Sequence, residues 1–226
     1  MMVRHGQASF DTTARAPDDY DQLSHRGEEQ ARLLGTHFAE RQLLFDRVFV
    51  GPRRRHRQTA DAVAAVYRDR GLAWPEPTTL PELDEHNGQE LLTRFNDSTV
   101  QRPNGATSQR EYLKLFQNVT RRWVRGELSV VDLEGWKDFR ARINGAVQKM
   151  TSDAGRKATV AAFTSGGPIA ATVGIALGTD DEKTLELSWI IRNTACSDFL
   201  FTDGRFSVMT FNAVSHLRKQ ELLTFI

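Results

Sequence analysis

Short apolar strands that lead directly into helices are the feature that most constrains the fold of this chain. Residues 45–50 and 159–164 are short runs rich in apolar, β-branched and aromatic side chains, as is typical of buried strands. A very short apolar start, which ends at Val3, is a third such run. Strands that alternate with helices predict an α/β protein, a three-layer sandwich whose mostly parallel central sheet carries helices on both faces.

The flanking helices and the final strands have local signals of their own. Ser24 can cap a helix that follows it, and residues 54–69 have the apolar spacing of a second helix. Residues 197–202 and 206–211 flank Asp203-Gly204, which is a two-residue hairpin signal. The last two strands are therefore expected to break the parallel pattern.

The sheet pattern disappears between Gly88 and Gly155. Amphipathic helices are expected near residues 112–124 and 133–150, with loops at Pro103-Asn104-Gly105 and Gly126. One apolar stripe in the second helix comprises Trp136, Phe139, Ile143, Val147 and Met150. Because about 65 residues are few for independent stability, we expect an inserted helical cap over 88–155 within a single domain of residues 1–226.

The charge balance and the cysteine content exclude several classes of protein. Thirty Lys and Arg residues against 29 Asp and Glu give a formal net charge of +1, which argues against nucleic acid or an anionic membrane as the main partner. No apolar run approaches the roughly 20 residues that a membrane helix needs. The single Cys196 cannot form an internal disulfide, and no Cys/His cluster suggests a metal, so we expect a cytoplasmic protein without a metal site.

The sequence Val3-Arg4-His5-Gly6 places three suitable groups at the end of a buried strand, the edge at which open α/β sheets bind ligands. Imidazole can attack phosphorus, arginine offers a planar fork to phosphate oxygens, and glycine lets the backbone approach closely. Taken alone, the triplet Arg4-His5-Gly6 is weak evidence for a phosphate site, and a surface turn is the preferred interpretation. The rest of the sequence has to distinguish a phosphate site from a surface turn.

A second cationic segment follows the strand that ends at Gly51-Pro52. It runs from Arg53 through Arg57 into a helix, whose free N–H groups and dipole favour phosphate at its start. For Arg53, Arg54 and Arg57, a solvated basic face is the preferred interpretation. A nucleic-acid patch receives no support, because no aromatic residues alternate with the basic ones.

The order and spacing of the motifs resemble the histidine phosphatase (phosphoglycerate mutase-like) superfamily, phosphatase branch. The matching segments are Arg4 to Phe10, Tyr20 to Ser24 with Gly27 and Gln30-Ala31, Arg55 ahead of Gln58-Thr59-Ala60, Leu83-Asp84-Glu85, Thr164-Ser165-Gly166-Gly167, Asn193, and residues 212–217. The matches extend from one end of the chain to the other, and only the helical insert lacks diagnostic residues.

The resemblance implies a phosphomonoesterase that works through a phosphohistidine and needs no cofactor. It implies that His5 is phosphorylated, that Arg4 and Arg55 hold the phosphoryl oxygens, and that Glu85 is the general acid. Glu82 is the alternative acid, since Glu82-Leu83-Asp84-Glu85 has three carboxylates in four positions. The expected partner is a small phosphorylated substrate or a phosphoprotein.

Ser165 departs from the family, which normally has a histidine directly before Gly-Gly. Ser165 can donate one hydrogen bond to phosphate and Gly166 can offer an N–H group, but the side chain of Ser165 cannot carry a positive charge. The loss of one charge-assisted hydrogen bond costs roughly 1.5–3 kcal/mol, or about 10- to 100-fold in rate. Two hypotheses follow: a slow or selective phosphatase, and a degenerate one that binds phosphorylated ligands or protein partners without turnover.

Other departures bear on the mutases of the superfamily and on the remaining histidines. Ala8 and Asp11 stand where the mutases usually carry Ser or Thr and Asn, and a carboxylate at 11 would repel a bisphosphate, so a mutase is disfavoured. His86 is a candidate to replace the missing imidazole, the alternative being a surface loop. No catalytic part is expected of the other histidines, which are expected to be solvent-facing, helix-packed or structural: His25, His37, His56 and His216.

Overall fold

A six-stranded sheet forms the centre of the protein, in the order β3-β2-β4-β1-β5-β6. The computed structural model describes residues 1–9, 21–95, 106–128, 132–155, 157–202 and 204–225, with only the backbone of 106–109. The strands are β1 (Met2–Arg4), β2 (Arg47–Val50), β3 (Thr78–Thr79), β4 (Val160–Thr164), β5 (Cys196–Thr202) and β6 (Arg205–Ala213). The first four are mutually parallel, and β5 is antiparallel to both β1 and β6.

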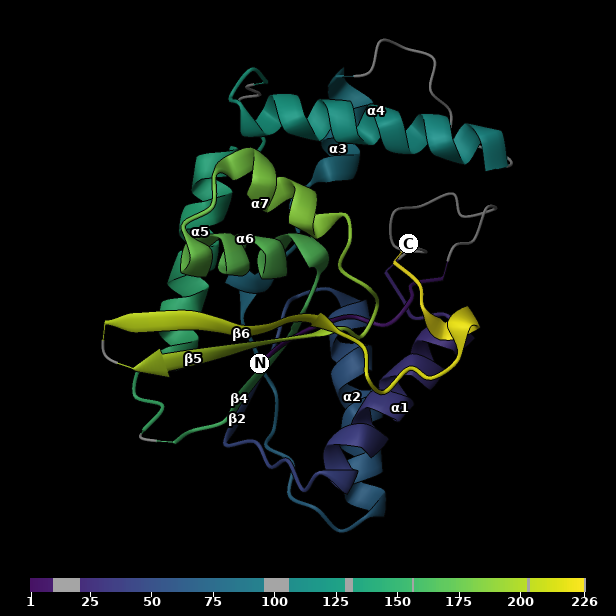
Figure 1. The fold of residues 1–226 in the computed structure, drawn as a ribbon, viewed down its shortest axis with the longest axis vertical. Helices are drawn as coiled ribbons and strands as arrows, with labels where there is room; N and C mark the ends of the chain where they lie inside the picture. Colours follow the sequence, from purple (N-terminus) through teal and green to yellow (C-terminus); the bar gives the residue numbers. More distant parts are fainter. Residues whose placement is uncertain (10–20, 96–105, 129–131, 156, 203, 226) are drawn as a thin grey trace.

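Helices cover both faces of this sheet, as the sequence predicted (Figure 1). One face carries α1 (His25–Glu40) and α2 (Arg54–Asp69), and the other carries α5 (Trp136–Thr151) and α6 (Gly166–Leu177), with α7 (Asp181–Ser188) beside α6. The alternation of strand side chains explains the two layers. Val3 packs with α1 and α2, whereas Met2 packs with α5 and α6. The predicted three-layer α/β architecture is confirmed.

Among the described residues, three α-helices lie between β3 and β4 in the chain. The expected helices near 112–124 and 133–150 are observed as α4 (Ala106–Val124) and α5, and the apolar stripe of α5 is buried throughout. The helix α3 (Gly88–Phe95) and the short β3 were not predicted. The expected loop at 103–105 lies outside the described residues. Short 3₁₀ helices complete the chain at Pro81–Leu83 and Gln220–Leu222.

The helix α5 belongs to two hydrophobic clusters at once. Val147 and Met150, near its end, pack against the sheet. Trp136 and Phe139, near its start, pack with Trp123 of α4 in a separate cluster. The helix therefore connects the sheet core to the helical insert.

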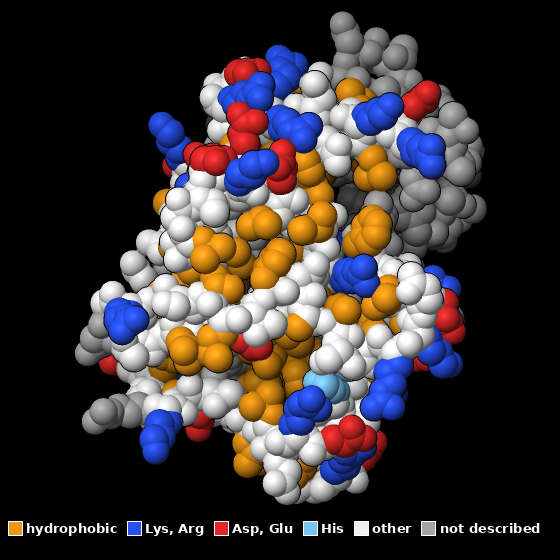
Figure 2. Space-filling view, viewed as in Figure 1, with side chains coloured by type: hydrophobic (Ala, Val, Ile, Leu, Met, Phe, Trp, Pro, Cys, Tyr) orange, Lys and Arg blue, Asp and Glu red, His pale blue; other side chains and the backbone are white. Residues whose placement is uncertain are grey.

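The surface has no single dominant charge on the face that Figure 2 shows. Basic and acidic side chains alternate around α7 and the end of α4, where Arg125 pairs with Glu182 at 2.8 Å and Lys183 pairs with Glu186 at 2.8 Å. Apolar side chains occupy much of the rest of this face (Figure 2). No helix within the described ranges is long and apolar enough to cross a membrane.

The carboxyl ends of the central strands meet at one edge of the sheet. Arg4 pairs with Thr164, and Val50 pairs with Phe163, so β1, β2 and β4 end side by side. The chemistry-bearing segments that follow these strands are thereby brought together, although they lie far apart in the sequence.

His216 packs beneath this edge and stabilises the turn that follows α7. Its side chain is buried, and its Nε2 lies 2.9 Å from the Oγ1 of Thr194, a residue with left-handed backbone (φ 56°). Burial, followed by the charge of the neighbouring His37, lowers the pKa of His216 to about 4. The structural role that the sequence suggested for His216 agrees with this packing.

The lowered pKa of His216 makes the stability of the fold depend on pH. The unfolded chain takes up a proton at His216 near pH 6.5, but the folded chain does so only near pH 4. The contribution of the neutral His216 ring to the unfolding free energy is therefore complete above pH 6.5 and is lost as the pH falls toward 4. We expect the difference in unfolding free energy between wild type and His216→Gln to narrow by about 2 kcal/mol from pH 7 to pH 5, measured by urea unfolding. His25→Gln, at an exposed site, should show no such narrowing. A constant difference for His216→Gln would contradict the expectation.

Candidate active site

His5 lies directly after β1 and is buried, with 3% of its surface exposed. Its backbone N–H donates to the Thr164 carbonyl at 2.8 Å, and its carbonyl accepts from the Asn193 side chain at 3.1 Å. The Nδ1 atom lies 2.7 Å from the Gly6 carbonyl oxygen. Because a carbonyl can only accept, Nδ1 carries the hydrogen, which leaves the lone pair of the neutral ring on Nε2.

The environment of His5 keeps the ring neutral. Burial lowers the pKa of His5 well below its usual value, and the positive charges of Arg55 and Arg4 lower it further. A neutral imidazole with its lone pair on Nε2 is the form that can attack an electrophile such as phosphorus.

Arg55 lies in the first turn of α2 and is buried. Its Nη1 donates to the Asp21 carboxylate at 3.0 Å, and its Nη2 lies 3.4 Å from the Ser165 hydroxyl. Asp21 also accepts from the Arg54 backbone N–H at 2.8 Å. One carboxylate from before α1 therefore caps α2 and orients the Arg55 guanidinium. The sequence did not reveal this arrangement, because no local pattern links residues that are 33 and 34 positions apart.

The neighbouring arginines point elsewhere. Arg53 pairs with Asp84 at 2.5 Å, and Arg57 pairs with Asp61 and Glu76, both at 3.0 Å. Their side chains are between one-third and one-half exposed. Of Arg53, Arg55 and Arg57, only Arg55 has a contact with Ser165 among those described.

Arg4 lies between the start of α6 and the C-terminal segment. Its Nη1 donates to the carbonyls of Ile191 and Phe225, the latter at 2.9 Å. A Cβ at Gly166 would lie 3.9 Å from Arg4 Nε, so the guanidinium borders the backbone at the start of α6. The structure thus brings His5, Arg4, Arg55 and Gly166 to the same edge of the sheet.

Ser165 occupies the position directly before α6. Its hydroxyl is buried and makes no capping bond to α6; instead it lies 2.7 Å from His56 Nε2 and 3.4 Å from Arg55 Nη2. The side chain therefore faces α2 at the sheet edge.

Of the two placements expected for His56, solvent-facing or helix-packed, the structure shows the second. It is fully buried, and its ring centroid lies 5.7 Å from that of His5. Burial, followed by the charges of Arg55 and Arg53, lowers the pKa of His56 well below its usual value. Its helical spacing with Thr59, Ala60 and Val63, which are also buried, is a sequence signal that could have placed it on the inward face of α2, although its contact with Ser165 has no such signal.

Glu85 reaches the start of α6 from the segment after β3. Its Oε2 accepts from the Gly167 backbone N–H at 3.0 Å, and its Oε1 accepts from the His86 N–H at 2.9 Å. A Cβ at position 167 would overlap Oε1, so only glycine admits the carboxylate there. With 21% of its side chain exposed, Glu85 lies between solvent and the buried groups.

Glu82, the alternative acid, faces away from these groups. Its carboxylate pairs with Lys149 on α5, and that hydrogen bond lowers the pKa of Glu82. The acid segment itself has two anchors. The hydroxyl of Thr164 donates to the Leu83 carbonyl at 2.6 Å, and the guanidinium of Arg142 on α5 donates to the carbonyls of Glu82 and Asp84 at 2.7 and 3.0 Å.

His86 is not part of a surface loop. Its side chain is 7% exposed and packs among aromatic rings of the helical insert, 5.1 Å from Trp123 and 5.7 Å from Phe139 between ring centroids. Its Nε2 lies 3.7 Å from Glu85 Oε1. His86 therefore borders Glu85 from the aromatic cluster.

The C-terminal segment supports His5 indirectly. Asn193, which bonds the His5 carbonyl, also accepts from the Thr224 hydroxyl at 2.9 Å. Gln30 of α1 donates to the same Thr224 hydroxyl at 2.8 Å. Asn193 and Gln30 are both motif residues of the sequence, and the structure shows that they meet through Thr224. Asp11 and Tyr20 lie outside the described residues.

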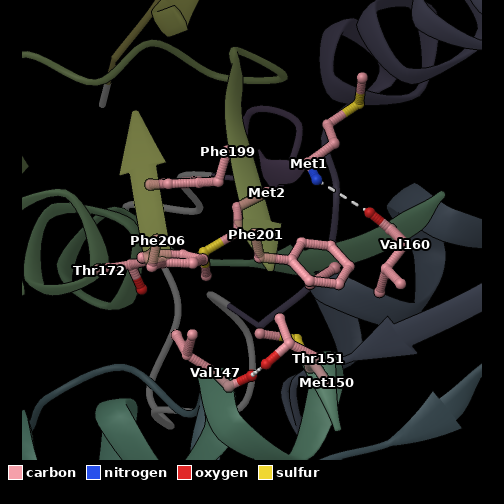
Figure 3. Close-up of a pocket in the computed structure, with 11 residues that line it drawn as sticks. Met1, Met2, Val147, Met150, Thr151, Val160, Thr172, Phe199, Phe201 and Phe206 are labelled. Carbon is pink, nitrogen blue, oxygen red and sulfur yellow. Dashed lines mark hydrogen bonds between the residues drawn. The ribbon is translucent and has the colours of Figure 1, made fainter. Parts of the chain in front are cut away.

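An apolar cavity of about 30 Å³ lies at the opposite edge of the sheet, near the start of β1 and β4 (Figure 3). Phe199, Phe201 and Phe206 line it, and the hydroxyls of Thr151 and Thr172 donate to carbonyls of their own helices. The cavity therefore offers no polar group for catalysis. Across the described ranges, no three His, Cys, Asp or Glu side chains are grouped so as to hold a metal ion.

Comparisons with known proteins bear on this arrangement. The sequence matches the Histidine phosphatase superfamily (branch 1) over residues 1–214. A phosphoglycerate mutase from Bacillus anthracis str. Sterne is 19% identical, with a TM-score of 0.64 over 95% of this chain and 92% of that one. Bacillus stearothermophilus YhfR is 18% identical, with a TM-score of 0.66 over 95% and 96%. A phosphoserine phosphatase from Entamoeba histolytica, in complex with 3-phosphoglyceric acid, is 15% identical, with a TM-score of 0.65 over 95% and 96%. No match was found among curated proteins.

The loop after His5 crosses α1 at backbone contact, which requires glycine at two positions. A Cβ at Gly27 would overlap the Gln7 carbonyl oxygen, and one at Gly6 would lie 2.5 Å from the Gly27 carbonyl oxygen. We expect Gly27→Ala to lower the unfolding free energy by at least about 2 kcal/mol in urea titration, although alanine is the better helix former. Gly145→Ala in α5, where a Cβ meets nothing within 4 Å, should instead raise it by about 0.5–1 kcal/mol. Equal changes in unfolding free energy for Gly27→Ala and Gly145→Ala would contradict the close backbone contact between the loop after His5 and α1.

Proposed function

Because this chain belongs to the histidine phosphatase superfamily, we propose that it is a metal-independent hydrolase of phosphomonoesters that works through a phosphohistidine at His5. The observation that carries the proposal is the state of His5. The ring is buried and neutral, and its Nδ1 is tied to the Gly6 carbonyl, so the lone pair on Nε2 is available as a nucleophile.

The proposed reaction has two steps. Nε2 of His5 attacks phosphorus, the bond from phosphorus to the ester oxygen breaks, and Glu85 in its acid form gives that oxygen a proton. Water then attacks the phosphohistidine, the Glu85 carboxylate takes its proton, and inorganic phosphate leaves with His5 restored. Arg4, Arg55, Ser165 and the Gly166 N–H stabilise the charge that spreads over the transferring oxygens.

The expected substrate is a small phosphorylated molecule or a phosphoprotein. A phosphoserine phosphatase of the same fold binds 3-phosphoglyceric acid, which supports a small anionic substrate. We take residues 88–155 as a cap inserted into one domain, and its side chains beside Glu85 and His86 as the elements that select the substrate. A cytoplasmic location is part of the proposal and rests on the single Cys196.

A second function is favoured by one observation, the serine at position 165. Without the charge of the family's histidine there, the site could bind phosphorylated ligands without turning them over. The two functions are distinguished by turnover, since both require an anion site and only one requires attack by His5.

We expect the wild-type protein to release phosphate from p-nitrophenyl phosphate and to retain labelled phosphate on His5 after an acid-free quench. His5→Ala should lose at least about a thousandfold in kcat and all of the label, because it removes the nucleophile. Phosphohistidine is detected by phosphorus NMR or by labelling under alkaline conditions. Wild-type protein that binds orthovanadate but shows neither turnover nor label would establish the binding function instead.

Glu85→Gln should slow alkyl phosphates far more than p-nitrophenyl phosphate. Alkoxides are poor leaving groups that need a proton, whereas nitrophenolate leaves without one. We expect about 100-fold or more against less than about 10-fold in kcat, measured with matched alkyl and aryl esters. Glu82→Gln, which removes a surface partner of Lys149, is the matched control and should change both substrates equally and slightly. Equal slowing of both esters by Glu85→Gln would exclude Glu85 as the general acid.

A further inference from the structure

The Ser165 hydroxyl is held between two side chains from α2. His56 Nε2 lies 2.7 Å from it and Arg55 Nη2 lies 3.4 Å from it. All three side chains are buried, with exposed fractions of 1% for Ser165, 0% for His56 and 7% for Arg55. A buried hydroxyl with two such neighbours has a restricted orientation.

The hydrogen-bond capacity of a hydroxyl shows what this arrangement offers. A hydroxyl has one hydrogen and two lone pairs, and a guanidinium can only donate, so Arg55 occupies one lone pair. In the tautomer that the proposal below requires, His56 Nε2 carries the hydrogen, and this N–H occupies the second lone pair. The hydroxyl hydrogen of Ser165 is then left for a third group, and a phosphoryl oxygen on His5 is an acceptor of the right kind.

The second imidazole is also close to the first. The ring centroids of His5 and His56 are 5.7 Å apart, although the two residues lie on different elements. The family's usual histidine directly before Gly-Gly is absent at position 165, yet an imidazole from α2 lies directly beside the Ser165 side chain. Burial keeps His56 neutral, so this imidazole acts through a hydrogen bond and brings no charge.

We propose that His56 and Ser165 together perform the phosphoryl-binding task that a single histidine performs in other members of the superfamily. In this pair, which we call the Ser165–His56 pair, Ser165 donates to the phosphoryl oxygen and His56 is a positioning residue that orients Ser165. The proposal rests on phosphoryl transfer at His5. It differs from the expectation that His86 compensates, because the described contacts of His86 are to aromatic rings and to Glu85.

The arrangement has a consequence for restoring the family's histidine. The ring of His56 occupies the space beside Ser165 Oγ, so Ser165→His alone would place two rings in one volume. Ser165→His combined with His56→Ala removes that overlap. The double variant carries the imidazole at position 165 instead of position 56, so one imidazole remains at the site.

The test compares kcat, KM and orthovanadate affinity across variants of the pair. We expect His56→Leu and Ser165→Ala each to lower kcat by about 10- to 100-fold with little change in KM, and the two together to cost no more than either alone. His56→Gln, which keeps a donor, should retain more activity than His56→Leu, which keeps only bulk. The exchange variant Ser165→His/His56→Ala should exceed both His56→Ala and Ser165→His in kcat. His25→Ala, at an exposed position, should match wild type.

Several outcomes would overturn the proposal. These are additive losses for the two single variants, equal activity of His56→Gln and His56→Leu, and an exchange variant no more active than His56→Ala. The fraction of folded protein, measured by urea unfolding, normalises every rate. If the wild type hydrolyses no phosphomonoester, the proposed function fails, and the pair is then judged on orthovanadate affinity alone, where His56→Leu and Ser165→Ala should each weaken binding about tenfold or more. Unchanged affinity in both would reject the pair independently of turnover.

Discussion

The hydrogen bond from the His5 N–H to the Thr164 carbonyl determines where the other groups of the site can stand. It extends the parallel pairing of β1 and β4 by one residue, past the last paired residues Arg4 and Thr164. Because of it, the loop that carries His5 and the loop that carries Ser165 leave the sheet at the same level. The first turn of α2 follows β2 in the chain, and because β2 pairs with β4, this turn lies beside the two loops. A strand of three residues is enough, since its neighbours on both sides hold it.

The electrostatics of the site follow from the close approach of these three segments at one edge of the sheet. Two buried imidazoles and two guanidiniums share one edge of the sheet, and full protonation of all four would be costly in a region with little water. The structure avoids that cost because both imidazoles have lowered pKa values and Asp21 neutralises Arg55. The site thus remains positive enough to attract an anion while the His5 ring stays uncharged.

The layers of the fold could be predicted from the sequence alone. Val3, Met2 and Phe163 follow strand alternation, and the apolar stripe on α5 follows helical spacing. The sequence was insufficient for β3, two exposed threonines without an apolar signal, and for α3, a helix of eight residues. Motif order pointed to His5, Arg55, Glu85 and Ser165, which the structure brings to one edge of the sheet or next to it. His56 and Asp21 escaped detection because their importance depends on contacts across 109 and 34 positions of the chain, which no local pattern encodes.

The two anchors of the acid segment also limit how this protein can diverge. Thr164 ties Leu83 to the sheet, whereas Arg142 ties the carbonyls of Glu82 and Asp84 to α5, the helix that is shared by the sheet core and the insert. Substitutions on the solvent side of the insert can accumulate freely, because they leave both anchors in place. A change that shifts α5, by contrast, carries the backbone on either side of Glu85 with it. Under the proposed mechanism, lineages that acquire a new substrate through this helix must therefore re-tune acid catalysis by Glu85 at the same time, so that selectivity and rate evolve as linked traits.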